Sequence, residues 1–63
     1  MTREELYAEA GQLIASAPGR FAGMRPVEAL HKAALLVAFE RDVSFALAGT
    51  LKDARRYLEK PPA

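Results

Sequence analysis

Residues 27–51 form a stretch that is apolar around nearly the whole circumference of a helix, and this feature limits the possible folds of the chain most. On a helical wheel the stretch has two apolar faces, formed by Val27, Leu30, Ala34, Val37, Phe45 and Ala48 and by Ala29, Ala33, Leu36, Val43, Leu47 and Leu51. A surface helix has one apolar stripe and a polar back, so a helix that is apolar on all sides has to be surrounded. Because the rest of a 63-residue chain offers little cover, the sequence predicts a partner.

The short length of the chain also predicts a partner. Residues 1–63 are expected to form one small domain, and domains near 60 residues bury only about 60% of their unfolded surface. Below about 70–80 residues, disulfides, a metal or oligomerisation usually add stability. The chain has no cysteine and one histidine, so we expect no disulfide, no metal and no cofactor. The remaining possibilities are a homo-oligomer, with a dimer favoured, and a complex with a larger protein.

Charge and hydropathy exclude some classes of protein. The formal net charge is +1, which does not by itself predict a polyanionic partner. The N-terminal sequence Met-Thr-Arg-Glu-Glu does not resemble a signal peptide. The longest apolar run, 33–39, is followed at once by Glu40, Arg41 and Asp42, so no membrane span is expected. These features predict a cytoplasmic protein.

A capping box predicts the start of a first helix, over about residues 2–17. In Thr2-Arg3-Glu4-Glu5 the Thr2 hydroxyl accepts from the Glu5 N–H while the Glu5 carboxylate reaches back. The helix carries an apolar stripe of Leu6, Ala10, Leu13, Ile14 and Ala17. Gly11 lies at the edge of this stripe, where it would allow another helix to come close.

A second helix is predicted to begin at Pro26, because proline suits the first helical position. Its end is ambiguous. Gly49-Thr50 would break it, with Thr50 and Asp53 capping a short third helix. We favour a continuous helix over about 26–59, because one seam of residues spaced mostly by four and three runs through the break. The expected fold is all-α, a helical hairpin that assembles as a homodimeric bundle resembling a coiled coil.

The seam is the predicted interface, because the first helix is too short to cover it. It consists of Ala29, Ala33, Leu36, Glu40, Val43, Leu47, Leu51, Ala54 and Leu58. Glu40 has two interpretations. It would fix the register of an antiparallel dimer by meeting Arg41 of the other chain, or Glu40-Arg41-Asp42 is a solvated band.

Further partner contacts are predicted in the inter-helix connection and in residues 52–60. These are Arg20, Phe21, Arg25, Lys52, Arg55, Arg56 and Tyr57. Arginines before a helix N-terminus suit an anion, whereas a tight connection with Phe21 folded inward is the alternative. The basic side of 52–60 suits nucleic acid, but cations near a helix C-terminus also complement the helix dipole.

The residues predict a non-enzymatic interaction module that self-associates or binds a larger protein as adaptor, assembly factor or inhibitor. His31 has no serine or threonine one turn away on its helical face, so no catalytic residue or small-molecule substrate is expected. The alternative function is a dimeric nucleic-acid-binding regulator that uses Arg20, Arg25 and the basic face of 52–60. In length and composition the chain is similar to short bacterial and phage accessory proteins, with no shared motif.

Overall fold

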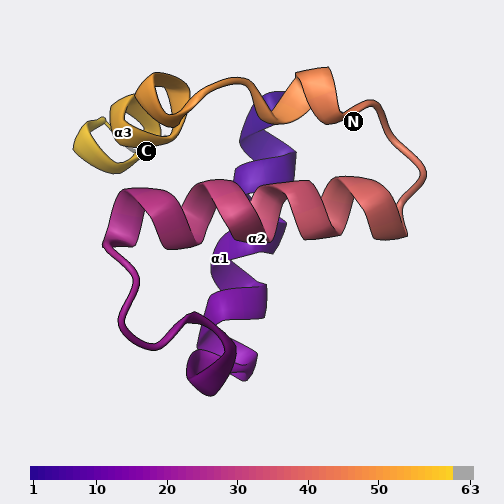
Figure 1. Cartoon of the computed structure of the whole chain (residues 1–63). Helices are drawn as coiled ribbons and strands as arrows, with labels where there is room; N and C mark the ends of the chain where they lie inside the picture. The colour runs from indigo at the N-terminus through magenta and orange to yellow at the C-terminus, as the bar shows by residue number, and fades with distance from the viewer. Residues whose placement is uncertain (61–63) are drawn as a thin grey trace.

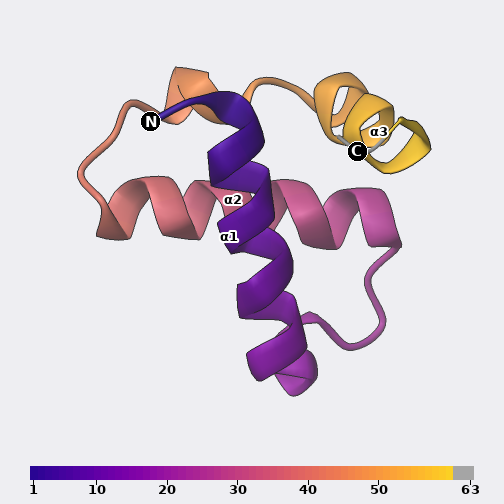
Figure 2. The same ribbon diagram turned by 180° about the vertical axis from the view of Figure 1, so that it is seen from behind.

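The computed structural model describes residues 1–60, which form three α-helices and two short 3-10 helices and contain no strand. The elements in chain order are α1 (Arg3–Ser16), η1 (Pro18–Phe21), α2 (Pro26–Glu40), η2 (Phe45–Ala48) and α3 (Leu51–Glu59). The predicted all-α class is therefore confirmed. In both ribbon views α1 crosses α2, and η2 and α3 lie over one side of α2 (Figures 1 and 2).

The first helix begins as predicted. The Thr2 hydroxyl accepts a hydrogen bond from the Glu5 N–H at 3.1 Å, and the Glu5 carboxylate accepts one from the Thr2 N–H at 2.8 Å. Pro26 occupies the first turn of α2, also as predicted. A capping box thus marks the start of α1, and a proline in the first turn marks the start of α2.

The continuous helix over 26–59 is wrong, because α2 ends at Glu40. Asp42 adopts a left-handed conformation with φ 56°. Its N–H donates to the Phe39 carbonyl, and the Val43 N–H donates to the Ala38 carbonyl at 2.8 Å. This pair of bonds is a Schellman motif, and aspartate tolerates the left-handed conformation better than most residues. Glu40-Arg41-Asp42 therefore ends a helix.

The chain turns a second time at Gly49, and α3 begins immediately after it. The Asp53 carboxylate accepts from the Thr50 N–H at 2.8 Å, which confirms the alternative of a capped third helix. The longest dimension of the molecule is 27 Å, whereas a 34-residue helix would measure about 50 Å. The seam is consequently divided among three elements.

The chain covers much of its own apolar stretch and leaves Phe39, Phe45 and Leu51 exposed, so a partner is not needed to cover the whole of it. Twelve apolar residues are buried, and seven of them are alanines: Ala10, Ala29, Ala33, Ala34, Ala38, Ala48 and Ala54. Alanine side chains are small, so α1, η2 and α3 approach α2 closely. Leu6, Tyr7, Phe21, Leu30 and Val37 supply the larger buried side chains.

The predicted seam residues have different environments. Ala29, Ala33 and Ala54 are buried in the core of the chain itself, so they are not available to a partner. Leu36, Val43 and Leu47 are half-buried, and Glu40, Leu51 and Leu58 are exposed. Arg41 forms an ion pair with Glu9 of the same chain. The seam is therefore not a single face.

Polar contacts hold α3 and η2 against α1 and α2. Arg3 donates from Nε to the Leu47 carbonyl at 2.8 Å and lies 3.5 Å from the Asp53 carboxylate. His31 Nε2 lies 2.9 Å from the Gly49 carbonyl oxygen, which only accepts, so this ring nitrogen is the donor. These contacts join residues far apart in the sequence around the turn at Gly49.

Replacing Gly49 is expected to destabilise the fold strongly. Gly49 has φ 68° and ψ −147°, a region that only glycine adopts readily. A Cβ there would lie 2.3 Å from the Asp53 Oδ2. We expect Gly49→Ala to lower the free energy of unfolding by about 2 kcal/mol or more, measured by urea denaturation followed by circular dichroism.

The matched control is Gly19→Ala, since Gly19 has no positive φ and no atom within 4 Å of an added Cβ. It should change the free energy of unfolding by less than about 0.5 kcal/mol. Equal effects of the two substitutions would contradict the described turn.

Candidate functional site

One concavity is an apolar groove of about 440 Å³ whose lining residues come from all three α-helices. Its walls come from α1, the connection to α2, the start of α2 and the end of α3, and its lining residues are Tyr7, Ala8, Gly11, Ile14, Pro18, Phe21, Met24, Pro26, Ala29, Leu30, Tyr57 and Leu58. No lining residue is charged. We call this surface the apolar groove.

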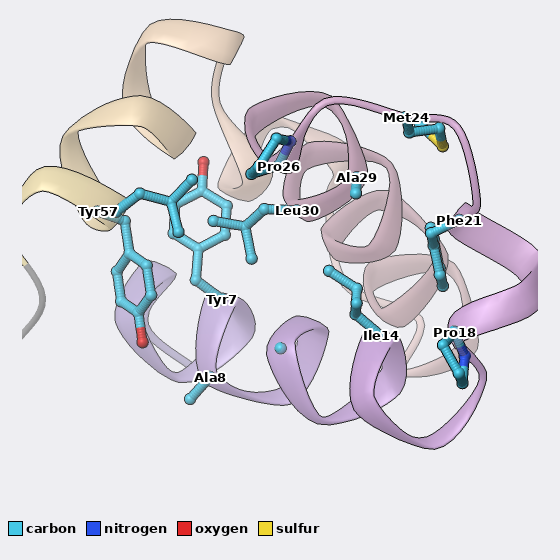
Figure 3. A pocket seen from close by; sticks show the side chains of 12 residues that line it. Tyr7, Ala8, Ile14, Pro18, Phe21, Met24, Pro26, Ala29, Leu30 and Tyr57 are labelled. Carbon is cyan, nitrogen blue, oxygen red and sulfur yellow. The ribbon is translucent and has the colours of Figure 1, made fainter.

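The two ends of the groove carry its bulky side chains. In Figure 3 one end holds Tyr7 and Tyr57, and the other holds Phe21, Met24 and Pro18. The tyrosine rings have centroids 5.2 Å apart and are tilted by 52°, and the separation lies within the range usual for interacting aromatic pairs. This ring pair joins α3 to α1 and closes one end of the groove.

Tyr7 is the best-anchored residue of the groove. Its side chain is 1% exposed, and its hydroxyl donates to the Ala48 carbonyl. Burial raises the pKa of Tyr7, with a further contribution from the nearby Asp53 carboxylate. The hydroxyl therefore stays protonated and keeps its donor role.

The middle of the groove is open at Gly11. Sequence reasoning expected this glycine to permit a close helix approach, but a Cβ at Gly11 would meet no atom within 4 Å. Ala8, the neighbouring lining residue on α1, is exposed. A glycine costs a helix interior about 1 kcal/mol relative to alanine, and no contact within the described chain accounts for Gly11.

Cations surround the α3 end of the groove. Lys52, Arg55, Arg56 and Lys60 are all exposed, and none takes part in an ion pair among residues 1–60. Of the two acidic residues of α3, Asp53 binds Thr50 and Arg3, whereas Glu59 is exposed and forms no ion pair within residues 1–60, so the cations outnumber the carboxylates. The surface beside Tyr57 is therefore positive.

The predicted partner contacts separate into two groups. Phe21 is buried and Tyr57 is half-buried against Tyr7, and both line the groove. Arg20 and Arg25 are exposed in the connection, with Arg25 lying 3.8 Å from the Glu28 carboxylate. Phe21 folds inward, as the alternative interpretation of the connection expected. The groove itself was missed, because it requires α3 to fold back onto α1.

A second apolar surface lies where α2 ends and η2 begins. Phe39 is 75% exposed and Phe45 is 55% exposed, on either side of the turn at 41–44. The N-terminus lies next to η2 in both ribbon views (Figures 1 and 2), and Met1 is 50% exposed. We call Met1, Phe39 and Phe45 the aromatic edge.

Within residues 1–60 no three His, Asp or Glu side chains are grouped as metal ligands. The His31 ring nitrogen is engaged by the Gly49 carbonyl. No helix in the described part of the chain has the length and hydropathy to span a membrane.

Comparisons with protein-family models, curated proteins and solved structures find no match for this chain.

The anchoring of Tyr7 makes a testable prediction. Tyr7→Phe leaves the buried Ala48 carbonyl without its donor, which should cost about 1–3 kcal/mol of stability. Tyr57→Phe is the matched control, because its hydroxyl makes no hydrogen bond within residues 1–60, and it should cost less than about 0.5 kcal/mol. Urea denaturation measures both, and similar losses would show that the Tyr7 hydroxyl does not anchor α1 to η2.

Proposed function

We propose that this chain is a non-enzymatic interaction module that binds a helix of a larger protein in the apolar groove. The observation that carries the proposal is an open groove with no charged lining residue, next to a glycine that faces no atom of its own chain. The absence of a side chain at Gly11 does not stabilise a fold that already has a core of small side chains. It does leave space that a side chain of a bound partner can fill.

The dimensions of the groove favour a short helix. Along α1 the lining runs from Tyr7 to Ile14, about 10 Å of helix axis. A partner helix of two to three turns would cover this length with anchors at i, i+3 or i+4, and i+7, the pattern of helix-in-groove recognition. Met24 at one end supports this, because methionine adapts its shape to a bound side chain.

Two further expectations from the sequence stay predictions. A nucleic-acid-binding role would use the exposed cations of α3, with Arg20 and Arg25. We favour protein binding because the apolar groove lacks the aromatic and cationic alternation that stacks and neutralises a nucleic-acid strand. The cytoplasmic location also stays a prediction.

Self-association is a second candidate, supported by the aromatic edge. Phe39 at the end of α2 is 75% exposed and Phe45 at the start of η2 is 55% exposed, and a second copy of the chain would cover these side chains. We expect the protein to dimerise with increasing concentration in light scattering, and Phe39→Glu with Phe45→Glu to keep it monomeric. Both side chains are exposed, so helicity should persist. A wild-type protein that is monomeric at all concentrations contradicts this candidate.

Filling the groove tests the main proposal. Gly11→Trp places a large side chain where an added Cβ meets nothing, while Gly11→Ala fills little space. Both should fold, and both should be stabilised by up to about 1 kcal/mol because a helical glycine is removed. Helical peptides of about 16 residues, near the lower limit for helices in water, would be selected from a displayed library on the wild-type protein.

Selected peptides should bind the wild-type protein and Gly11→Ala alike, and bind Gly11→Trp about tenfold or more weakly, which corresponds to about 1.4 kcal/mol. Fluorescence anisotropy measures the affinities, and circular dichroism checks the fold of each variant. Peptides that bind Gly11→Trp as tightly as the wild-type protein would place recognition elsewhere. A library from which no peptide is enriched would contradict the proposal.

A further inference from the structure

The charges around the apolar groove indicate what kind of helix fits it. Two further depressions, of about 550 and 270 Å³, border the groove. Pro26 lines both the groove and a depression that also contains Arg25, Lys52 and Arg55. Tyr7 and Tyr57 line both the groove and a depression that contains Arg56 and Lys60. Cations therefore line both depressions that border the groove.

The acidic residues near these depressions are fewer than the cations, and two of them, Glu4 and Glu59, are exposed and form no ion pair within residues 1–60. Asp53 is engaged by the Thr50 N–H and by Arg3. Glu28 lies 3.8 Å from Arg25, and none of the ion pairs formed within residues 1–60 reaches Arg55, Arg56 or Lys60. The rim of the groove, formed by Arg55, Arg56 and Lys60, therefore carries cations that form no ion pair within residues 1–60.

We propose that the apolar groove binds an acidic amphipathic helix of a partner protein. The apolar side of that helix lies on Gly11, Ile14 and Leu30, and its Asp and Glu side chains flank the apolar side and face Arg55, Arg56 and Lys60. This inference rests on the proposed helix-docking function and adds the charge of the partner. Complementary rim charges chiefly set the choice of partner and the rate of association.

Three synthetic peptides with identical apolar anchors test the proposal. Their polar positions carry glutamate, glutamine or lysine, and fluorescence anisotropy gives the affinity of each peptide for the full chain. We expect the acidic peptide to bind about 5- to 30-fold more tightly than the neutral one, as several exposed ion pairs together provide. The basic peptide should bind most weakly. The preference should shrink between about 50 and 300 mM salt, because exposed charges are screened.

Charge-reversal variants assign the effect to the rim. Arg55→Glu and Arg56→Glu are each expected to weaken the acidic peptide by about 3- to 10-fold and to leave the neutral peptide unchanged. Lys32→Glu is the matched control, because Lys32 is exposed on α2 and lines neither the groove nor its bordering depressions. It should change neither affinity. Circular dichroism confirms that all three variants stay folded.

The outcomes separate this inference from the proposed function. Three peptides that bind equally, and that Gly11→Trp blocks, would overturn the acidic partner and keep the helix-docking groove. If no peptide binds the wild-type chain, both proposals fail. A labelled single-stranded oligonucleotide that binds more tightly than the acidic peptide, loses affinity with Arg56→Glu and is unaffected by Gly11→Trp would overturn the inference and assign the cations to nucleic acid.

Discussion

Asp42 and Gly49, both with positive φ, determine where the second half of the chain lies. Asp42 completes the Schellman motif that ends α2, and Gly49 gives the turn from which α3 starts. Without these turns the apolar residues of 27–51 would stand on one long helix that the chain could not cover. With them, η2 and α3 cover α2 from one side while α1 crosses it (Figure 1). The buried alanines let these elements come close enough to exclude water.

The same turns create the apolar groove. They bring Tyr57 of α3 against Tyr7 of α1, residues that are 50 positions apart in the sequence. Three of the five larger buried side chains, Tyr7, Phe21 and Leu30, line the groove together with the half-buried Tyr57. A partner helix would extend this small core with its own apolar side chains. The small size of the core is thus a physical reason for the chain to bind a partner helix, as proposed.

Local sequence signals predicted the beginnings of helices and failed at one helix end. Thr2 with Glu5, Pro26, and Thr50 with Asp53 all act through contacts within one turn of helix, so they can be recognised without knowing the fold. Asp42 gave no comparable signal, because aspartate rarely occupies a left-handed helix end that glycine usually takes. The seam through 29–58 was misleading, since apolar spacing alone does not distinguish one long helix from segments buried separately.

The candidate site was harder to predict than the helices, because it depends on contacts between distant segments. Phe21, Tyr57 and the cations of 52–60 were identified from their own neighbourhoods, but Ile14 looked like an ordinary member of an apolar stripe and Tyr7 was not singled out. Gly11 was noticed as a place where another helix could come close, and the structure shows no atom within 4 Å of an added Cβ there.

The return of α3 onto α1 is the central claim, and nuclear Overhauser effects between the rings of Tyr7 and Tyr57 test it most directly. With ring centroids 5.2 Å apart, clear cross-peaks are expected between the two rings in the dilute protein. Helical contacts between residues i and i+3 should stop at the turns near Asp42 and Gly49. Uninterrupted helical contacts through 41–50, without ring-to-ring cross-peaks, would contradict the fold and the groove built on it.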